Sequence, residues 1–342
     1  MILKRLELQE KLNVLSKAYL VKPSMPIYQF VKFDDDKLVM SDGNVSISCG
    51  FKSGIKALVP FKQLFDIVNK LSSETIELII ETNNVILKSN KSKFTLNTGN
   101  YSDYPGLRQI DNVSKLIIKS NEFLKAINDV SFCCSKDLKR PILTGVSFGE
   151  NSIIATDSYR LAFNNTELGL KCIISSRDLE NLFSIIDNNI DIKITNNDNL
   201  ANFEFKDITY QTRLLNGVFP NTMSLINKNY SIKLSINKNE LIQALEMANL
   251  VNDNNRIAIL DINENSLIVK NHKSQSGKYE EEISCKCDEK LNICCNSDYL
   301  IETLHRLTSD TITINFINNK SPFKIETNET IYVLCPIRAE EY

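Results

Sequence analysis

Residues 117–148, IIKSNEFLKAINDVSFCCSKDLKRPILTGVSF, decide the fold, because the pattern of this stretch recurs twice more along the chain. The related stretches are LELQEKLNVLSKAYLVKPSMPIYQFVKF from Leu6 and LSINKNELIQALEMANLVNDNNRIAILDI from Leu234. Each copy predicts a helix, a polar loop and then a strand. A repeat of this length means that one structural unit is used several times, so it sets the architecture before any single motif does.

A second unit recurs in the same order and predicts a helix, a turn and a strand. Its copies are VPFKQLFDIVNKLSSETIELII from Val59, ISSRDLENLFSIIDNNIDIKI from Ile174 and CNSDYLIETLHRLTSDTITINF from Cys295. The first two copies keep one register, since matching residues lie 115 positions apart, and the third copy is slightly longer. The matching pairs are Pro26 and Pro141, Leu64 and Leu179, and Pro105 and Pro220.

The predicted helices each carry one apolar stripe, as Phe61, Leu64 and Val68 show at positions i, i+3 and i+7. Asn237 with Glu240, and Ser175 with Asp178, indicate helix N-terminal caps. Between the helices, alternating strands with Asp-Gly, Asn-Asn and Asn-Lys turns indicate antiparallel hairpins. We therefore predict an α+β chain of three tandem domains, each with two helices packed on an antiparallel sheet. The predicted domains are residues 1–112, 113–227 and 228–342.

Composition limits the classes of partner. The 342 residues carry a net charge of −2, so any contact with nucleic acid must come from locally clustered Lys and Arg. The N-terminus has no apolar signal region, and no stretch approaches the roughly 20 apolar residues that span a bilayer, so we expect a cytoplasmic protein. The nine cysteines include no CxxC pair, which favours free thiols buried as small apolar groups and predicts no metal site and no cofactor.

Five short motifs carry a resemblance to a known family. They are RPILTGVSF at Arg140, ATDSYRLAF at Ala155, LLNGVFP at Leu214, SPFKIE at Ser321 and YVLCPIR from Tyr332. In this order on a threefold repeat, the motifs resemble the bacterial β sliding clamp over essentially the whole chain. The resemblance implies a head-to-tail homodimer whose six domains close a ring, with the strands outside and the helices around a hole for duplex DNA. It also implies a non-catalytic processivity factor that tethers DNA polymerase, the clamp loader and repair proteins through short peptide motifs.

Basic residues on or after the first helices are the candidates for DNA contact, because a sliding tether must hold phosphates without reading bases. The alternative is that these are ordinary solvated helix faces, since Glu10, Glu122 and Glu246 occupy the same helices. The candidates are Lys11, Lys17, Lys22, Lys125, Lys136, Lys139, Arg140, Arg177, Lys238 and Arg256.

The resemblance also implies an apolar groove between the second and third domains that takes a Leu and a Phe of the partner peptide. Departures from the family pattern at Ser158, Ser224 and Cys335, and the extra residues 339–342, predict an altered peptide preference. If the turn at Ser158 needs a positive φ, serine is a costlier occupant than glycine. The implied groove residues are Leu143, Thr156, Ser158, Tyr159, Arg160, Leu161, Pro220, Leu225, Pro322, Val333, Leu334, Cys335, Pro336, Ile337 and Arg338.

By the same resemblance, the joint between subunits brings Asn249 and Leu250 of one chain to Phe94 and Leu96 of the other. An apolar edge strand is an aggregation hazard unless it is paired, and a subunit boundary would pair it. The alternative is that Phe94 and Leu96 belong to the core of their own domain.

Catalysis finds little support in the sequence. The chain has no GxxxxGK[ST], GxGxxG or GxSxG motif, and its only histidines are His272 and His305. Asp157 and Asp178 are better explained by a turn and a helix cap than by an acid–base pair. Two alternatives stay open: a specialised clamp from a mobile element or second gene copy, and an α/β enzyme with a hidden site.

Overall fold

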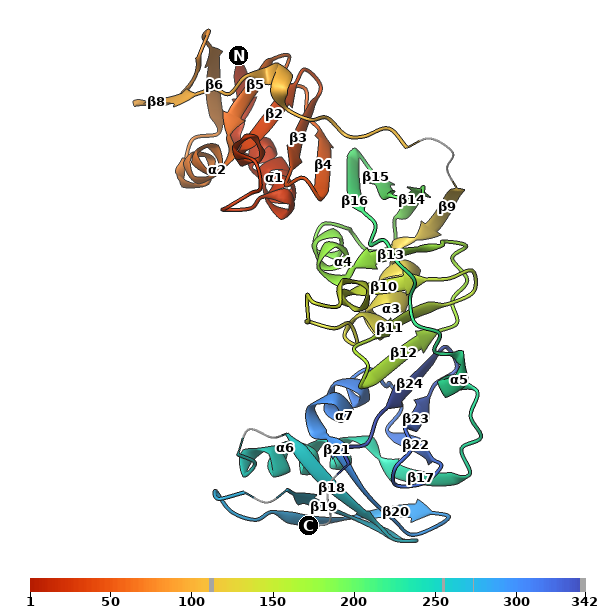
Figure 1. Ribbon diagram of the computed structural model, residues 1–342. Helices are drawn as coiled ribbons and strands as arrows, with labels where there is room; N and C mark the ends of the chain where they lie inside the picture. The colour runs from red at the N-terminus through yellow and green to blue at the C-terminus, as the bar shows by residue number, and fades with distance from the viewer. Residues whose placement is uncertain (111–113, 254–255, 273, 339–342) are drawn as a thin grey trace. The chain divides into compact units, whose positions relative to one another are not determined.

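A computed structural model of the chain describes residues 1–110, 114–253, 256–272 and 274–338, and shows one order of elements three times (Figure 1). The order is strand, helix, four strands, helix, three strands. The first copy has β1 (Ile2–Lys4), α1 (Arg5–Leu15), β2 (Phe30–Asp34), β3 (Lys37–Ser41), β4 (Val45–Gly50), β5 (Lys56–Pro60), α2 (Phe61–Lys70), β6 (Thr75–Ile80), β7 (Asn84–Ser89) and β8 (Ser92–Asn97).

The second and third copies follow the same plan, which confirms the predicted α+β repeat. The second has β9 (Ser114–Lys119), α3 (Ser120–Ser131), β10 (Gly145–Phe148), β11 (Ile153–Thr156), β12 (Arg160–Asn164), β13 (Cys172–Ser175), α4 (Ser176–Phe183), β14 (Asp191–Asn196), β15 (Leu200–Phe205) and β16 (Ile208–Arg213). After a short helix α5 (Met223–Ile226), the third has β17 (Ile232–Asn237), α6 (Lys238–Leu250), β18 (Ile257–Ile262), β19 (Ser266–Asn271), β20 (Glu280–Cys287), β21 (Leu291–Asn296), α7 (Ser297–Leu304), β22 (Thr311–Phe316), β23 (Phe323–Glu326) and β24 (Thr330–Leu334).

The helices form where the apolar spacing predicts them. Leu8, Leu12 and Leu15 of α1 are fully buried, as a stripe at helical spacing requires when one face packs on a sheet. The Asn237 side chain accepts hydrogen bonds from the backbone N–H groups of Asn239 and Glu240, so the predicted cap of α6 is confirmed.

The predicted cap at Ser175 is wrong, because the Ser175 side chain makes no capping hydrogen bond. The Asp178 carboxylate instead accepts hydrogen bonds from the Asn44 amide at 2.8 Å and the Thr212 hydroxyl at 2.9 Å. Burial raises the pKa of Asp178 and outweighs these two bonds. The carboxylate therefore ties the β3–β4 turn of the first copy and β16 of the second copy to α4 instead of closing a helix end.

The chain divides into two compact units, and each unit holds one junction between successive copies. One unit comprises residues 1–124 and 174–216, and the other comprises residues 125–173 and 217–342. In the first unit, β4 pairs with β16 inside a sheet of order β5-β2-β3-β4-β16-β15-β14-β9. In the second, β12 pairs with β24 inside the order β13-β10-β11-β12-β24-β23-β22-β17-β20-β19-β18-β21. Each junction is thus a continuous hydrogen-bonded ladder.

The two junctions also bury an aromatic residue at the same position. Tyr210 of β16 and Tyr332 of β24 are among the largest side chains that are fully buried, at 0% and 1% exposure. The equivalent strand of the first copy, β8, forms the edge of a separate sheet of order β1-β6-β7-β8. Its apolar residues Phe94 and Leu96 are only half-buried. Within the described residues, β8 is therefore a third edge of the same design that no further strand covers.

None of the nine cysteines forms a disulfide within the described residues, and six are buried, which confirms their predicted use as small apolar groups. Burial raises the pKa of Cys49 to about 12, so this thiol stays protonated. Among the described helices, none has the length and apolar character needed to cross a membrane.

Candidate partner groove and nucleic-acid surface

The turn between β11 and β12 is built by the side chain of Asp157. Its Oδ1 accepts hydrogen bonds from the backbone N–H groups of Tyr159 at 2.8 Å and Arg160 at 2.9 Å. The Thr156 hydroxyl donates to the Arg160 carbonyl at 2.6 Å and closes the turn from the other side. Asp157 therefore has the turn role that the sequence predicts.

Ser158, at the tip of this turn, has a φ of 83°, so the turn does need the left-handed region. Its hydroxyl accepts a hydrogen bond from the Arg140 guanidinium at 2.9 Å. The structure thus shows the strain that the sequence predicts for a serine at a position suited to glycine.

We expect Ser158→Gly to stabilise the folded chain by about 0.5–1 kcal/mol, because glycine adopts this φ without a Cβ clash. Chemical denaturation followed by circular dichroism measures the change. The matched control is Ser158→Ala, which also removes the hydroxyl but keeps the Cβ. Equal midpoints for the two variants would show that the backbone carries no strain here.

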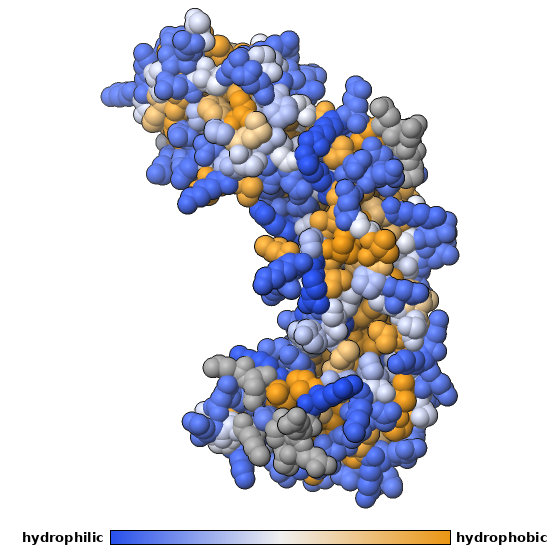
Figure 2. Space-filling model, viewed as in Figure 1, coloured by the Kyte–Doolittle hydropathy of each residue, from blue (hydrophilic) through white to orange (hydrophobic). Residues whose placement is uncertain are grey.

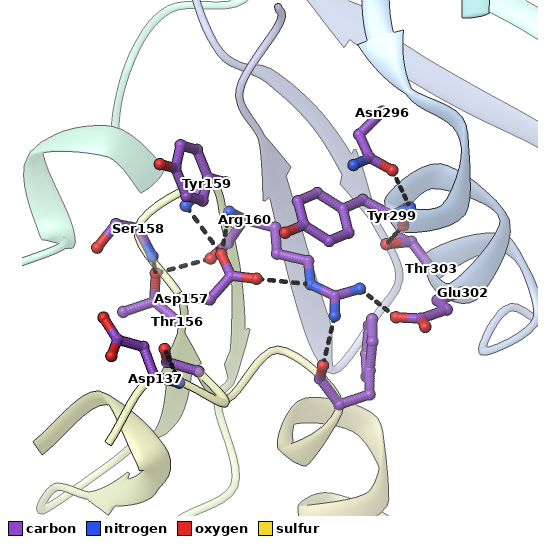
Figure 3. A network of polar contacts seen from close by, with 12 residues as sticks. Asp137, Thr156, Asp157, Ser158, Tyr159, Arg160, Asn296, Tyr299, Glu302 and Thr303 are labelled. Atoms are coloured by element: carbon purple, nitrogen blue, oxygen red, sulfur yellow. Dashed lines mark hydrogen bonds and ion pairs between the residues drawn. The ribbon is translucent and has the colours of Figure 1, made fainter. Parts of the chain in front are cut away.

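Arg160, the first residue of β12, is buried at 8% exposure and is held on every side (Figure 3). Its guanidinium donates to Asp157 at 3.2 Å, to Glu302 of α7, and to the Phe132 carbonyl at 2.8 Å. The rings of Tyr299 and Phe132 lie at 4.2 and 5.2 Å from the guanidinium carbon. Arg160 is thus a clasp between α3, the β11–β12 turn and α7, and it does not present a free guanidinium to a ligand.

The floor of the implied groove is the ladder between β12 and β24. Leu161 pairs with Val333, and both are buried in one cluster with Ile226 of α5. The ladder continues past β24, because the backbone N–H of Cys335 donates to the Tyr159 carbonyl at 2.8 Å. The structure therefore brings the two central motifs of the groove into contact, although the sequence separates them by more than 150 residues.

The remaining groove residues differ in exposure. Leu143, Thr156 and Leu334 are buried, and Leu225, Pro322, Cys335, Pro336 and Ile337 are half-buried. Ser158, Tyr159, Pro220 and Arg338 are exposed, and Tyr159 keeps 59% of its surface. The tail 339–342 lies outside the described residues. An apolar floor with exposed residues at its rim suits an extended peptide.

Sequence reasoning missed the residues that hold Arg160. Phe132, Tyr299 and Glu302 lie on α7 or just after α3, far from the ATDSYRLAF motif in the chain. Local spacing carries no signal for such contacts. Ile226 was also missed, although its apolar character beside LLNGVFP offered a hint.

The candidate DNA-contact residues fall into two groups. Lys17, Lys22, Lys136, Lys139 and Arg177 make no ion pair within the part of the chain that the structure describes. Lys11 pairs with Asp207, Lys125 with Glu329, Arg140 with Asp137 and Arg256 with Asp298, while Lys238 donates to the Leu307 carbonyl at 2.8 Å. The face drawn in Figure 2 is largely polar, with apolar patches between. The unpaired group is the better placed to meet phosphates.

The candidate joint residues of the third copy lie at the end of α6. Leu250 is 76% exposed, whereas Asn249 is half-buried and its amide donates to Asp298 at 3.0 Å. The Ser297 hydroxyl donates to the Asn249 carbonyl oxygen. Asn249 therefore braces α6 against α7, and Leu250 is the residue offered outward.

No group of three or more His, Cys, Asp or Glu residues that could hold a metal ion occurs within residues 1–110, 114–253, 256–272 and 274–338. The candidate site consists of strand ladders, an apolar floor and surface cations. Such an arrangement suits binding of extended chains and polyanions.

Family models for the DNA polymerase III beta subunit match nearly the whole chain. The N-terminal domain model matches residues 1–108, the central domain model 117–221 and the C-terminal domain model 223–337. The chain belongs to the β sliding clamp family. As a member of that family, it is a DNA sliding clamp and a non-catalytic processivity factor, and three clamp domains make up its fold.

Individual relatives agree with this assignment. The chain is 30% identical to the beta sliding clamp of Streptococcus pneumoniae strain R6 over 96% of both chains, and 28% identical to that of Bacillus subtilis strain 168 over 97% of both. The crystal structure of the Bacillus subtilis sliding clamp matches with a TM-score of 0.92 at 25% identity, covering 99% of each chain. The DNA polymerase III beta chain of Streptococcus pneumoniae TIGR4 matches with a TM-score of 0.90 at 28% identity, again over 99% of each.

Proposed function

We propose that two copies of this chain close head to tail into a ring around duplex DNA, and that the groove over β12 and β24 tethers polymerase and other replication proteins. The observation that carries this proposal is the uncovered edge at β8. Phe94 and Leu96 are half-buried, whereas the equivalent residues of β16 and β24 are buried, and these two strands each pair with a strand of the preceding copy. The equivalents are Tyr210 and Thr212 in β16, and Tyr332 and Leu334 in β24.

A second chain is the natural cover for that edge. The third copy carries β20, which stands in the element order where β4 and β12 stand in the first two copies. Pairing β8 with β20 of a second chain would repeat the two internal junctions a third time. Because the contact joins different surfaces, two such joints close a ring of six domains. Leu250, exposed at the end of α6, supports this joint.

In the proposed ring, positively charged side chains contact the DNA phosphates, and no recognition of individual bases is needed. The unpaired cations of the first helices and their loops suit phosphates of any sequence, which is what a sliding tether requires. Because the overall charge of the chain is −2, such contacts would form only where Lys and Arg side chains are clustered. The paired cations, such as Lys11 and Lys125, would contribute less because each already has a carboxylate partner.

The groove proposal includes a changed peptide preference. The positive φ of Ser158 and the exposed Tyr159 support a rim that differs from one built on glycine. This rim favours the alternative that the chain is a specialised clamp, from a mobile element or a second gene copy, that binds a different set of partner proteins. We also infer a cytoplasmic location, and domain limits of 1–112, 113–227 and 228–342.

Retention on circular DNA tests the ring. Once loaded on nicked circular DNA, the protein should stay bound through gel filtration and should slide off after the circle is cut. A variant that cannot dimerise should be lost from both forms and serves as the control. Equal retention on circular and linear DNA would exclude an encircling mode of binding.

A further inference from the structure

The first internal junction carries a counterpart of the proposed partner groove. In the partner groove, Leu161 of β12 lies opposite Val333 of β24. At the first junction, Ser46 of β4 lies opposite Gln211 of β16. Ser46 and Leu161 are 115 residues apart, which is the spacing of the repeat. The two floors are thus built on equivalent strands at the same register, but one is apolar and the other is polar.

The turn beside this counterpart has the same geometry as the turn at Ser158. Gly43 lies 115 residues before Ser158 and has a φ of 90°, close to the 83° of Ser158. The Asp42 carboxylate accepts hydrogen bonds from the backbone N–H groups of Asn44 at 2.8 Å and Val45 at 2.6 Å, as the carboxylate of the β11–β12 turn does. The repeat therefore reproduces the rim of the groove as well as its floor.

The Gln211 side chain holds residues 105–108, here called the linker segment, at this counterpart. Its Oε1 accepts a hydrogen bond from the backbone N–H of Arg108 at 3.1 Å, and its Nε2 donates to the Arg108 carbonyl at 2.8 Å. A primary amide that bonds the N–H and the carbonyl of one residue recognises the main chain and not the side chain. Because Gln211 is only 3% exposed, its amide depends on these partners.

Little space remains between the linker segment and the junction. The remaining cavity is about 20 Å³, which holds no more than about one water molecule. Pro105, Gly106 and Arg108 of the linker segment line it together with Ser46 and Gln211 of the junction. The counterpart of the partner groove is therefore filled by the chain itself.

Tyr104 anchors the start of the linker segment. Its side chain is 4% exposed and lies in one cluster with Val39 and Leu58. Its hydroxyl accepts a hydrogen bond from the backbone N–H of Ser41 at 2.8 Å. Burial raises the pKa of Tyr104, so the hydroxyl stays protonated. The anchor fixes where the linker segment begins and so brings it to Gln211.

The partner groove differs because the equivalent segment folds into a helix. Met223 lies 115 residues after Arg108 and is the first residue of α5, whereas the linker segment forms no helix. Val333, the counterpart of Gln211, has no amide to hold a peptide group. Ile226 at the end of α5 instead packs against the apolar floor. The floor over β12 and β24 therefore lacks the main-chain clasp that fills the first junction.

We propose that the first junction is a second peptide groove, which the chain fills with its own linker segment. Its ligand is an extended peptide that Gln211 binds through the main chain, and its polar floor does not select the apolar side chains that suit the partner groove. A ligand on a short tether acts at an effective concentration of about millimolar, so a free peptide at micromolar concentration does not displace it. Release of the linker segment exposes one additional groove in each chain.

Trypsin cleavage of the bond between Arg108 and Gln109, followed by mass spectrometry, tests the clasp. Gln211→Ala should speed this cleavage about tenfold, because both hydrogen bonds to Arg108 are lost. The matched control is Asn202→Ala, since Asn202 accepts the third hydrogen bond of the Gln211 amide at 2.8 Å. Its loss leaves the two bonds to Arg108 and should change the rate less than about threefold. Equal rates for Gln211→Ala and the unaltered chain would overturn the proposal.

A labelled peptide with the sequence of residues 104–110, YPGLRQI, tests whether the vacated groove binds. Arg108→Pro removes the N–H that donates to Gln211 and should release the linker segment, with circular dichroism confirming the fold. Fluorescence anisotropy should then show saturable binding of one peptide per chain, at least about tenfold tighter than to the unaltered chain. Adding Gln211→Ala should remove this gain.

Two outcomes of the peptide titration would refute the second groove. Equal binding to the unaltered chain and to both variants would mean that the peptide binds elsewhere. Absence of binding to the Arg108→Pro chain would mean that the linker segment covers no peptide site. Neither outcome bears on the proposed ring, because the groove lies within one chain and the titration contains no DNA.

Discussion

Arg160→Ala should destabilise the folded chain by about 3 kcal/mol, because it removes one partner of a buried ion pair and leaves Asp157 without its counter-charge. The loss also frees the Phe132 carbonyl and opens space between the rings of Phe132 and Tyr299. The effect should appear as a lower urea midpoint. It should also weaken peptide binding at the proposed groove, since Tyr159 lies in the turn that Arg160 holds in place.

A matched control is Arg140→Ala. Arg140 lies in the same region and pairs with Asp137 at 3.3 Å, but both side chains are nearly half exposed. Its removal should cost no more than about 0.5 kcal/mol, as for most surface ion pairs. Similar midpoints for the two alanine variants would mean that burial of the Arg160 network adds nothing to stability.

Leu250→Asp should convert the dimer into monomers at concentrations where the unaltered chain is paired. In the proposed ring, an aspartate at the end of α6 would face Phe94 and Leu96 in each of two joints, and an unpaired charge against apolar residues is costly. A weakening of 100-fold or more in dimer affinity is therefore expected, on the order of 3 kcal/mol over both joints. Sedimentation velocity measures it.

The control for Leu250→Asp is Leu138→Asp. Leu138 is 84% exposed, so both variants replace an exposed leucine by the same acid. Only Leu250 lies at the proposed joint, and Leu138→Asp should leave the dimer intact. Unchanged thermal unfolding of both proteins would show that the effect comes from association. If both variants stay dimeric, the joint lies elsewhere.

Much of the fold follows from the sequence because its signals are local and repeated. The stripe of Leu8, Leu12 and Leu15 predicts α1, and three copies of the same order agree with one another. The turn at Ser158 is also local, but a serine does not by itself favour a positive φ; the departure from the family pattern raised that possibility, and the structure shows it.

Contacts between distant segments were not predictable in this way. Asp178 looks like a helix cap from its neighbours, but Asn44 and Thr212 engage its carboxylate from 134 and 34 residues away. Arg160 looks like part of a groove wall, but Glu302, 142 residues further on, completes its burial. The spacing of residues along the sequence does not show which distant residue a side chain contacts, so it cannot favour a distant contact over one with a sequence neighbour.

The β4–β16 and β12–β24 ladders join successive copies in the same way. This likeness has a consequence for which junction of the proposed ring lies between subunits. If the three junctions of the proposed ring have the same geometry, the position of the chain ends determines which junction lies between two subunits and is held without a covalent link. A circular permutant that joins the present ends and begins at the second domain would turn the β4–β16 ladder into the subunit boundary. The new subunit boundary would then carry the uncharged pair of Ser48 and Thr209.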